Sequence, residues 1–575
     1  MKYTITYENP NTQYIPITME MDVEKDNFVE LQFPTWRPGR YERGEFVKNI
    51  HGFKVSNEKG KKIEAFKITK DSWKVNCEDA KSIRVSYKYY ASELNAGSTY
   101  MDESQLYVNP VNCLIYKAEE QKSSCEVKLV IPESFKIAAG KEFKQNHATF
   151  NSYHELVDTP FIASNSLTHL EFTCYKTNFH LWFQGDVKLD EKRIIKDLTA
   201  YTKSQIEKFE KFPVSDYHYL YQILPINAYH GVEHQTSTVI ALGPTYDLMG
   251  SLYDDFLGVS SHELYHTWNV KALRPAEMYP YDYSRENYSR QGYVTEGVTT
   301  YMGDLYLVES GVKDWKWYKK ELEKLLQRHF DNFGRFNYSV AESSFDTWLD
   351  GYVAGVPNRK VSIYNEGAIL SLVTDAKIRT NSANKASLHH VMKEMYETFA
   401  LNDKGYTERD FQGVVEKYAN ENLKDYFANY YYGLHSFEHI VSEALEQLGL
   451  VIKMDKNPAF STNVIGVKCL IEGSKTVVKK LYPGCAADLG GIILDDEIVS
   501  INGFKVNKDL DKWVEYFQDD QIELVVSRKG KIINLTCPHT NKSYFPIYKI
   551  EKAKAPSNLQ KRIFKKWCGT DWDEI

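Results

Sequence analysis

The segment SHELYHTWNVKALRP, residues 261–275, carries the motif from which the rest of the chain can be interpreted. It places His262, Glu263 and His266 in the order H-E-x-x-H. The pattern predicts a helix over 253–268, in which residues four apart share a face and the two imidazoles lie about 6 Å apart. Imidazole nitrogens suit Zn2+, and the glutamate is placed to act as the base for an attacking water. The segment therefore predicts two metal ligands and a general base.

This pentapeptide alone does not decide the chemistry. With 16 histidines among 575 residues, a chance match somewhere in the chain has a probability of about 3%. A surface helix with two exposed histidines is the alternative interpretation.

A catalytic zinc site needs a third protein ligand and an open fourth position. Glu296 is the best candidate, because it is a carboxylate at a core-facing position of an apolar helix predicted over 296–309. The spacing from His266 leaves room for a loop and a returning helix. A glutamate favoured by the dipole at a helix N-terminus is the alternative. Asp304, on the same face, could orient a ligating histidine.

The composition indicates several globular domains. A length of 575 residues predicts three or four domains, and 42% hydrophobic with 26% charged residues is typical of globular proteins. The net charge of −7 provides no general basic field for nucleic acid or an anionic membrane. No apolar stretch approaches the roughly 20 residues that span a bilayer. We therefore expect neither nucleic acid nor a membrane as a partner.

The N-terminal residues and the cysteines bear on cellular location. Residues 1–18 alternate polar and apolar side chains and lack the apolar stretch of a secretory signal. This predicts a cytoplasmic protein, or a periplasmic or secreted one if a leader has been removed. The eight cysteines include no CxxC pair, and we expect most of them to be core thiols.

Hydrophobic periodicity divides the chain into regions. Residues 1–178 contain short alternating runs between turns, which predicts an N-terminal β domain resembling a sandwich. Helical periodicity dominates residues 179–450, and a short β-rich domain follows over 451–541. Residues 542–575 form a C-terminal tail with a basic cluster. The expected fold class is multidomain α+β.

Five separated blocks resemble the glycyl aminopeptidase family of zinc metallopeptidases, which are relatives of leukotriene A4 hydrolase. The blocks are FPTWRPGRY (33–41), SHELYHTWNVKALRP (261–275), TEG (295–297), SVAES (339–343) and VSIYNEGA (361–368). The resemblance implies a mostly helical, thermolysin-like catalytic domain. It also implies one Zn2+ per chain, held by His262, His266 and Glu296.

The resemblance extends to the substrate. The segment HGVEH, residues 230–234, resembles a family strand that contains Gly231 and whose glutamate, here Glu233, binds the free α-amine of a peptide. A buried carboxylate suits an ammonium group. His230 departs from the usual glycine. Tyr364 matches the tyrosine that stabilises the oxyanion. An ordinary strand-end glutamate and an aromatic core residue are the alternatives.

Residues 481–503 resemble the core of a PDZ domain and end in the hairpin signal Asn502-Gly503. Asp495 stands where glycine is usual, so the turn there could be altered. A PDZ-like domain could bind an extended peptide at its sheet edge. A structural or substrate-access role is equally compatible with the sequence.

Together these features predict a zinc aminopeptidase that removes glycine or alanine from peptides with a free N-terminus. The preference for small residues rests on the resemblance alone. One alternative is a zinc endopeptidase, in which Glu233 is incidental and the PDZ-like domain recruits substrates. The other is an inert scaffold whose PDZ-like domain binds peptide termini.

Overall fold

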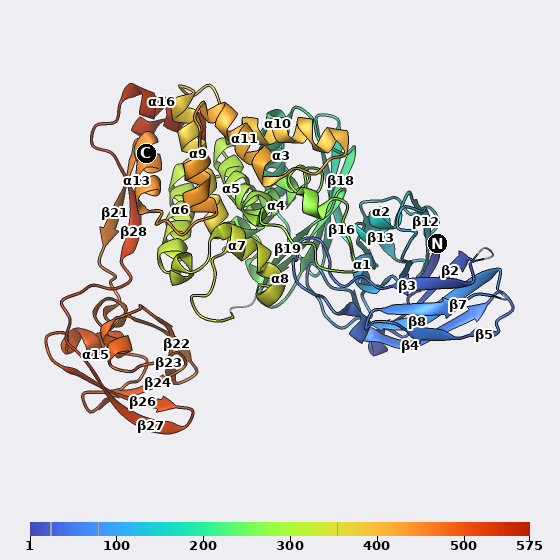
Figure 1. Ribbon diagram of the computed structural model, residues 1–575, viewed down its shortest axis with the longest axis horizontal. Coiled ribbons are helices and arrows are strands. Elements are labelled where there is room, and N and C mark those ends of the chain that lie inside the picture. The colour runs from blue at the N-terminus through green and yellow to red at the C-terminus, as the bar shows by residue number, and fades with distance from the viewer. Residues whose placement is uncertain (24–25, 79, 353–354) are drawn as a thin grey trace. The chain divides into compact units, whose positions relative to one another are not determined.

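The computed structural model describes residues 1–23, 26–78, 80–352 and 355–575. They form two compact units. The first unit comprises residues 1–318, 334–448 and 558–575, and the second comprises residues 319–333 and 449–557 (Figure 1). Within the described ranges, no helix is long and apolar enough to cross a bilayer.

The first unit begins with a β domain of three sheets, which confirms the predicted N-terminal β domain. In its largest sheet, strands β2 and β8 alternate buried and less buried residues, so this sheet buries one face, whereas β10 and β15 of the second sheet are buried along their whole length. The strand orders are β14-β12-β1-β2-β8-β4-β5, β13-β15-β10-β9 and β11-β3-β7-β6. Trp36 and Tyr116 are fully buried in the shared core.

The strands of this domain are β1 Lys2–Thr6, β2 Tyr14–Asp22, β3 Phe28–Gln32, β4 Ile50–Asn57, β5 Lys62–Ile63, β6 Ala65–Lys67, β7 Ser72–Asn76, β8 Ser82–Tyr90, β9 Tyr100–Met101, β10 Gln105–Val108, β11 Tyr116–Lys117, β12 Cys125–Val130, β13 Lys136–Ala139, β14 His147–Phe150 and β15 Phe161–Ser164. Two short helices, α1 Pro110–Cys113 and α2 Tyr153–Val157, accompany them.

A five-stranded sheet follows in the order β16-β17-β18-β20-β19. Its strands are β16 Thr168–Cys174, β17 Thr177–Gln184, β18 Asp216–Ile223, β19 Ala228–Glu233 and β20 Ser237–Gly243. Strands β17, β18 and β20 are parallel, and β19 is an antiparallel edge strand. One face packs on helices through residues such as Phe183 and Tyr221, and the other meets the β domain, where Leu220 and Tyr107 share a cluster.

Helices make up most of the remaining first unit and lie on one side of the five-stranded sheet (Figure 1). They are α3 Glu191–Phe209, α4 Tyr253–Tyr265, the π-helical turn η5 Tyr293–Val298, α5 Thr299–Glu309, α6 Trp315–Phe330, α7 Val340–Phe345, α8 Thr347–Asp350, α9 Ile363–Asn381, α10 Leu388–Thr398, α11 Glu408–Ala419, α12 Lys424–Tyr426, α13 Glu438–Gln447 and α16 Asn558–Cys568. Helix α6 continues into the second unit.

The second unit contains a sheet in the order β22-β23-β24-β26-β27, with β25 beside β24. Its elements are β22 Val467–Glu472, β23 Lys475–Leu481, α14 Ala486–Leu489, β24 Glu497–Ile501, β25 Phe504–Lys505, α15 Leu510–Tyr516, β26 Ile522–Arg528 and β27 Lys531–Cys537. Asn502 and Gly503 both have positive φ and form the expected tight turn. Asp495 itself adopts φ 66°, so it takes the left-handed conformation of the usual glycine.

This sheet is joined to the rest of the chain through a two-stranded ribbon. Strand β21, Leu450–Asp455, pairs antiparallel with β28, Ile547–Lys552, and Asp455 lies opposite Ile547. The chain then returns to the first unit as α16, where Trp567 is fully buried. The predicted boundaries at 178, 450 and 541 stay predictions. All eight cysteines are free and seven are buried, which confirms that most are core thiols.

Candidate metal centre and substrate cleft

Helix α4 presents the two motif histidines on one face. His266 follows its last residue with helical dihedral angles, and the His266 amide donates to the His262 carbonyl at 3.3 Å. The Nε2 atoms of the two rings lie 3.0 Å apart. The spacing of four residues therefore brings both imidazoles together, as the sequence predicts.

A sharp turn after the helix fixes the orientation of His266. Val270 has φ 104°, which is rare for a β-branched residue, and this strained turn places the Asn269 carbonyl beside the ring. Because a carbonyl only accepts, His266 Nδ1 must donate to it, at 2.9 Å. The Nε2 atom is then the ring nitrogen that faces Glu296 and that can bind a metal once its proton is lost. Asp304, which was expected to orient a histidine, does not provide this contact.

Glu296 enters the site from the π-helical turn η5. Two glycines allow this turn to approach α9 closely, because a Cβ on Gly297 would lie 2.4 Å from the Gly367 Cα. The Asn269 side chain fastens the same turn, donating to the Val294 carbonyl at 2.8 Å and to Thr299 Oγ1 at 3.0 Å. The glycines of the TEG and YNEG blocks are thus explained by backbone contact.

The three predicted ligands form one compact group. Glu296 Oε2 lies 3.3 Å from His266 Nε2 and 3.7 Å from His262 Nε2. Burial raises the pKa of Glu296, but the charge of His266 and the hydrogen bonds from His262 and His266 together outweigh burial and lower that pKa. Two imidazoles and one carboxylate are a donor set that suits Zn2+ with an open fourth position. The residues present therefore fit a catalytic metal.

Glu263 lies beside this group on the side of strand β19. It is 4% exposed, and a Cβ on Gly231 would come within 2.1 Å of Glu263 Oε1. Glycine at 231 therefore leaves the space that this carboxylate occupies. Burial raises the pKa of Glu263 well above its usual range, the carboxylates of Glu233 and Glu296 add to the increase, and His266 opposes it.

Glu233 is at the end of the edge strand β19, close to the candidate ligands. Carboxylate and imidazole atoms of Glu233, Glu263 and His266 lie within 4.8 Å of one another. Glu233 is 3% exposed, and within the described residues its Oε1 has no hydrogen-bond partner. His230 does not distort this strand, which pairs regularly with β20.

Tyr364 borders the same space from α9. Its ring centroid lies 6.3 Å from that of His262 and 6.3 Å from that of Tyr352. Burial, and then the charge of Glu296, raise the pKa of Tyr364, so its hydroxyl stays protonated and can donate. The same two causes raise the pKa of Tyr41 and Tyr352.

The sequence analysis did not single out Asn269 or Arg37 as site residues. A Cβ on Gly39 would lie 2.5 Å from Glu233 Oε2, so the segment 33–41 covers this carboxylate. Arg37 is 5% exposed, and its Nη1 has no hydrogen-bond partner among the residues that the structure describes. The sequence indicated Arg37 only as a charged residue within the segment FPTWRPGRY. It indicated Asn269 only by its position three residues after His266.

Two regions of the chain match domains of a known protein family. Residues 2–165 match the Peptidase M61 N-terminal domain, and residues 255–370 match the M61 glycyl aminopeptidase domain. The chain therefore contains both domains of M61 glycyl aminopeptidases. Residues 477–528 match a PDZ domain, which confirms the predicted C-terminal PDZ-like domain. The M61 match identifies the protein as a metallo-aminopeptidase.

Two solved structures are similar to this chain. An aminopeptidase N family protein from Idiomarina loihiensis is 26% identical, with 99% of each chain covered and a TM-score of 0.90. An M1 zinc metallopeptidase from Deinococcus radiodurans is 13% identical, with 76% of this chain and 94% of its own covered and a TM-score of 0.45. No curated protein matches this chain. The first likeness confirms the multidomain α+β fold.

Proposed function

We propose that this protein is a zinc aminopeptidase that removes glycine or alanine from peptides with a free N-terminus. The observation that carries this proposal is the buried, unpartnered carboxylate oxygen of Glu233 beside Glu263 and His266. A buried carboxylate without a partner is costly, and an ammonium group offsets that cost with a charge-assisted hydrogen bond. An α-amine held here would limit cleavage to the first peptide bond.

His262, His266 and Glu296 would hold one Zn2+ per chain. The bound ion would polarise the scissile carbonyl and lower the pKa of water. Glu263 is the general base in this proposal. Its raised pKa suits a group that accepts a proton from the attacking water and then donates it to the leaving amine.

The remaining site residues orient the peptide and stabilise charge. An extended substrate could pair with the open edge of β19 at Gly231, next to Glu263. Tyr364 would donate to the oxyanion that develops on the carbonyl. Tyr41 and Tyr352 occupy space near Glu233 and Glu296, which supports a preference for a small first residue.

Hydrolysis of Gly-, Ala- and Leu-amides, each with a free and an acetylated N-terminus, tests this function. We expect cleavage of the free Gly and Ala substrates, because acetylation removes the cation that Glu233 binds. Cleavage regardless of acetylation would instead identify a zinc endopeptidase. Zinc binding without any turnover would favour the inert scaffold.

The Glu263→Gln variant tests the mechanism. We expect it to bind metal normally and to lose about 10²–10⁴-fold in kcat, because the amide cannot accept the proton. Glu133→Gln, at an exposed position of the β domain, is the control. Near-normal turnover by the Glu263 variant would refute the proposed base.

For the PDZ domain we propose an extended peptide ligand at β22. This strand is at the edge of its sheet, and Leu470 and Ile471 on it are 54% and 44% exposed. Exposed apolar residues on an open edge suit a peptide that adds as another strand. The alternative is a structural or substrate-access role, and the affinity of the full chain for a peptide library distinguishes the two.

We also propose a cytoplasmic location, supported by the eight free cysteines, since reducing compartments keep thiols unpaired. Cell fractionation tests it.

A further inference from the structure

A second group of metal-binding side chains lies on the five-stranded sheet, apart from the catalytic centre. Alternation along the strands points Phe172 and Phe179 to the helices and points His169, Glu171 and His180 to the opposite face. Glu171 on β16 lies directly opposite His180 on β17. Directly opposed residues have Cβ atoms about 4.5–5.5 Å apart, so the pairing of the strands holds these side chains together.

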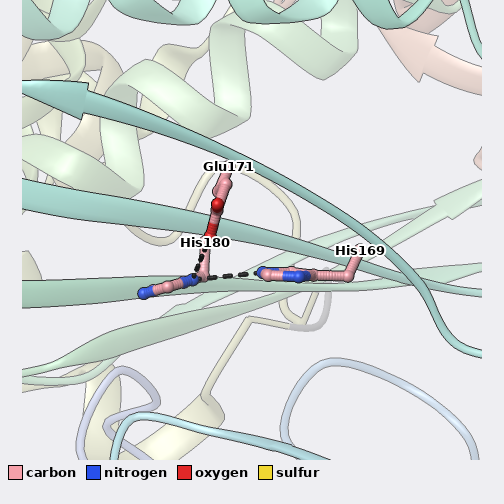
Figure 2. A group of neighbouring side chains, drawn as sticks. All are labelled: His169, Glu171 and His180. Atoms are coloured by element: carbon pink, nitrogen blue, oxygen red, sulfur yellow. Dashed lines mark hydrogen bonds and ion pairs between the residues drawn. The ribbon is translucent and has the colours of Figure 1, made fainter.

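Figure 2 shows how the three side chains converge. His169 Nε2 lies 3.1 Å from His180 Nδ1, and Glu171 Oε2 lies 3.7 Å from the same nitrogen. One ligand atom from each of the three residues lies within 4.8 Å of the others. The three donor atoms are therefore close enough together to bind one metal ion.

The catalytic centre of the same chain provides a standard for these distances. There the two imidazole nitrogens lie 3.0 Å apart, and the carboxylate oxygen lies 3.3 Å and 3.7 Å from them. Nitrogen ligands at about 2.0–2.1 Å from a tetrahedral Zn2+ are about 3.3 Å apart. The group on the sheet has the same donors, with its imidazole nitrogens 3.1 Å apart and the carboxylate oxygen 3.7 Å from one of them.

Neighbouring side chains support His180 as a ligand. Asp216 Oδ1 faces the other ring nitrogen, Nε2, at 3.8 Å. A carboxylate behind a ligating histidine is a common arrangement that orients the ring.

The next histidine on this face is excluded from the group. His218 lies opposite His180 on β18, and their ring centroids are 4.5 Å apart. Its Nδ1 accepts a hydrogen bond from Trp182 Nε1 at 3.2 Å. His180, Trp182 and His218 line a groove of about 900 Å³ beside the β domain, so solvent reaches the group.

We infer that His169, Glu171 and His180 form a second site for a divalent transition-metal ion, Zn2+ in particular. The side chains of Glu171 and His180 are 69% and 20% exposed, whereas those of the catalytic Glu296 and His266 are both 2% exposed. Ordering exposed side chains costs conformational entropy, so this site binds Zn2+ more weakly than the catalytic centre. Water completes the coordination.

Zinc stoichiometry of the full chain tests the inference. Protein is dialysed against a series of buffered free Zn2+ concentrations, and bound zinc is measured by elemental analysis. We expect two equivalents for the wild type, and one for a variant that combines His169→Ala with His180→Ala. These residues are outside the catalytic centre, so peptidase activity stays unchanged. A wild type that saturates at one equivalent, or a double variant that still binds two, overturns the second site.

Two further variants separate a built site from incidental binding. Glu171→Gln keeps both imidazoles and removes one charged ligand, so we expect the second equivalent to bind about 10-fold or more weakly. His439→Ala is the matched control, because His439 Nδ1 lies 3.5 Å from Glu443 without a second imidazole in that pair. Loss of the second equivalent in this control, or full affinity in the Glu171 variant, would contradict the assignment.

Discussion

At the scale of single residues, Asn269 connects the two halves of the proposed metal centre. Its carbonyl orients His266, and its side-chain amide holds the turn that carries Glu296. Asn269→Ala keeps the carbonyl and loses the amide contacts. We therefore expect the affinity for the catalytic metal to fall about 10–100-fold, as is typical when a residue behind the ligands is removed. Competition with a chelator measures this fall, and unchanged affinity would show that the amide has no positioning role.

Asp158 is a residue whose substitution should lower the free energy of unfolding. Its carboxylate accepts from Lys271 Nζ at 2.7 Å, and from the Gln235 amide at 3.0 Å. Lys271 has a side chain that is 1% exposed, so Asp158→Asn leaves a buried cation without its charged partner. We expect a loss of about 3–5 kcal/mol in the free energy of unfolding, measured with urea. Asp571→Asn breaks an exposed ion pair with Lys565 and is the control, with little effect.

The ion pair of Asp158 and Lys271 also makes the free energy of unfolding depend on pH. Burial alone would raise the pKa of Asp158, but the charges and hydrogen bonds of Lys271 and His234 together outweigh burial and lower that pKa well below its usual range. A carboxyl with a lowered folded pKa stabilises the protein above its unfolded pKa of about 3.9 and loses that contribution as the pH falls below it. Unfolding at pH 7 and pH 3 should show a smaller acid loss in Asp158→Asn than in the wild type.

At the scale of elements, α16 completes the core of the first unit. Trp567 is fully buried, and its Nε1 donates to the Tyr301 hydroxyl at 2.8 Å, which in turn donates to Asp375 at 2.7 Å. Trp567→Ala would leave a cavity and remove the donor to the Tyr301 hydroxyl, which would keep only its bond to Asp375. We expect a loss of about 3–5 kcal/mol in unfolding free energy. Trp317→Ala, at a half-buried position of α6, should cost clearly less, and equal losses would contradict this role of α16.

The sequence predicts some of these elements better than others. The spacing of His262 and His266 specifies a helix face, because the helical period is a local property. The approach of Gly297 to Gly367 and the contact of Gly231 with Glu263 depend on how separate elements pack. Composition and periodicity contain no signal for them. The same applies to His169 and His180, whose meeting depends on strand register.

At the scale of the whole molecule, the PDZ domain is inserted at the end of the ribbon β21–β28. Asp455 and Ile547 are paired across this ribbon, so a two-residue turn can join them. We expect a protein in which Asn-Gly replaces residues 456–546 to fold and to cleave small amides within about two-fold of the wild-type rate. Activity and circular dichroism measure this.

A chain that ends at residue 557 is the informative comparison. It keeps the whole second unit but loses α16 and with it Trp567, so we expect poor folding and little activity. Good activity in this shortened chain, together with failure of the Asn-Gly variant, would contradict the division of the molecule into these units. The sequence alone does not reveal the return of α16, because its contacts with Tyr301 and Asp375 are distant along the chain.

The position of α16 also determines the order in which the protein matures during synthesis. Residues 1–448 leave the ribosome first, yet their core is incomplete until the tryptophan of α16 emerges. At about 5–20 residues per second, translating the intervening segment takes about 5–20 seconds. During that interval the PDZ domain can fold, whereas the first unit still lacks α16. The nascent enzyme therefore acquires its PDZ domain before the core of its catalytic unit is complete.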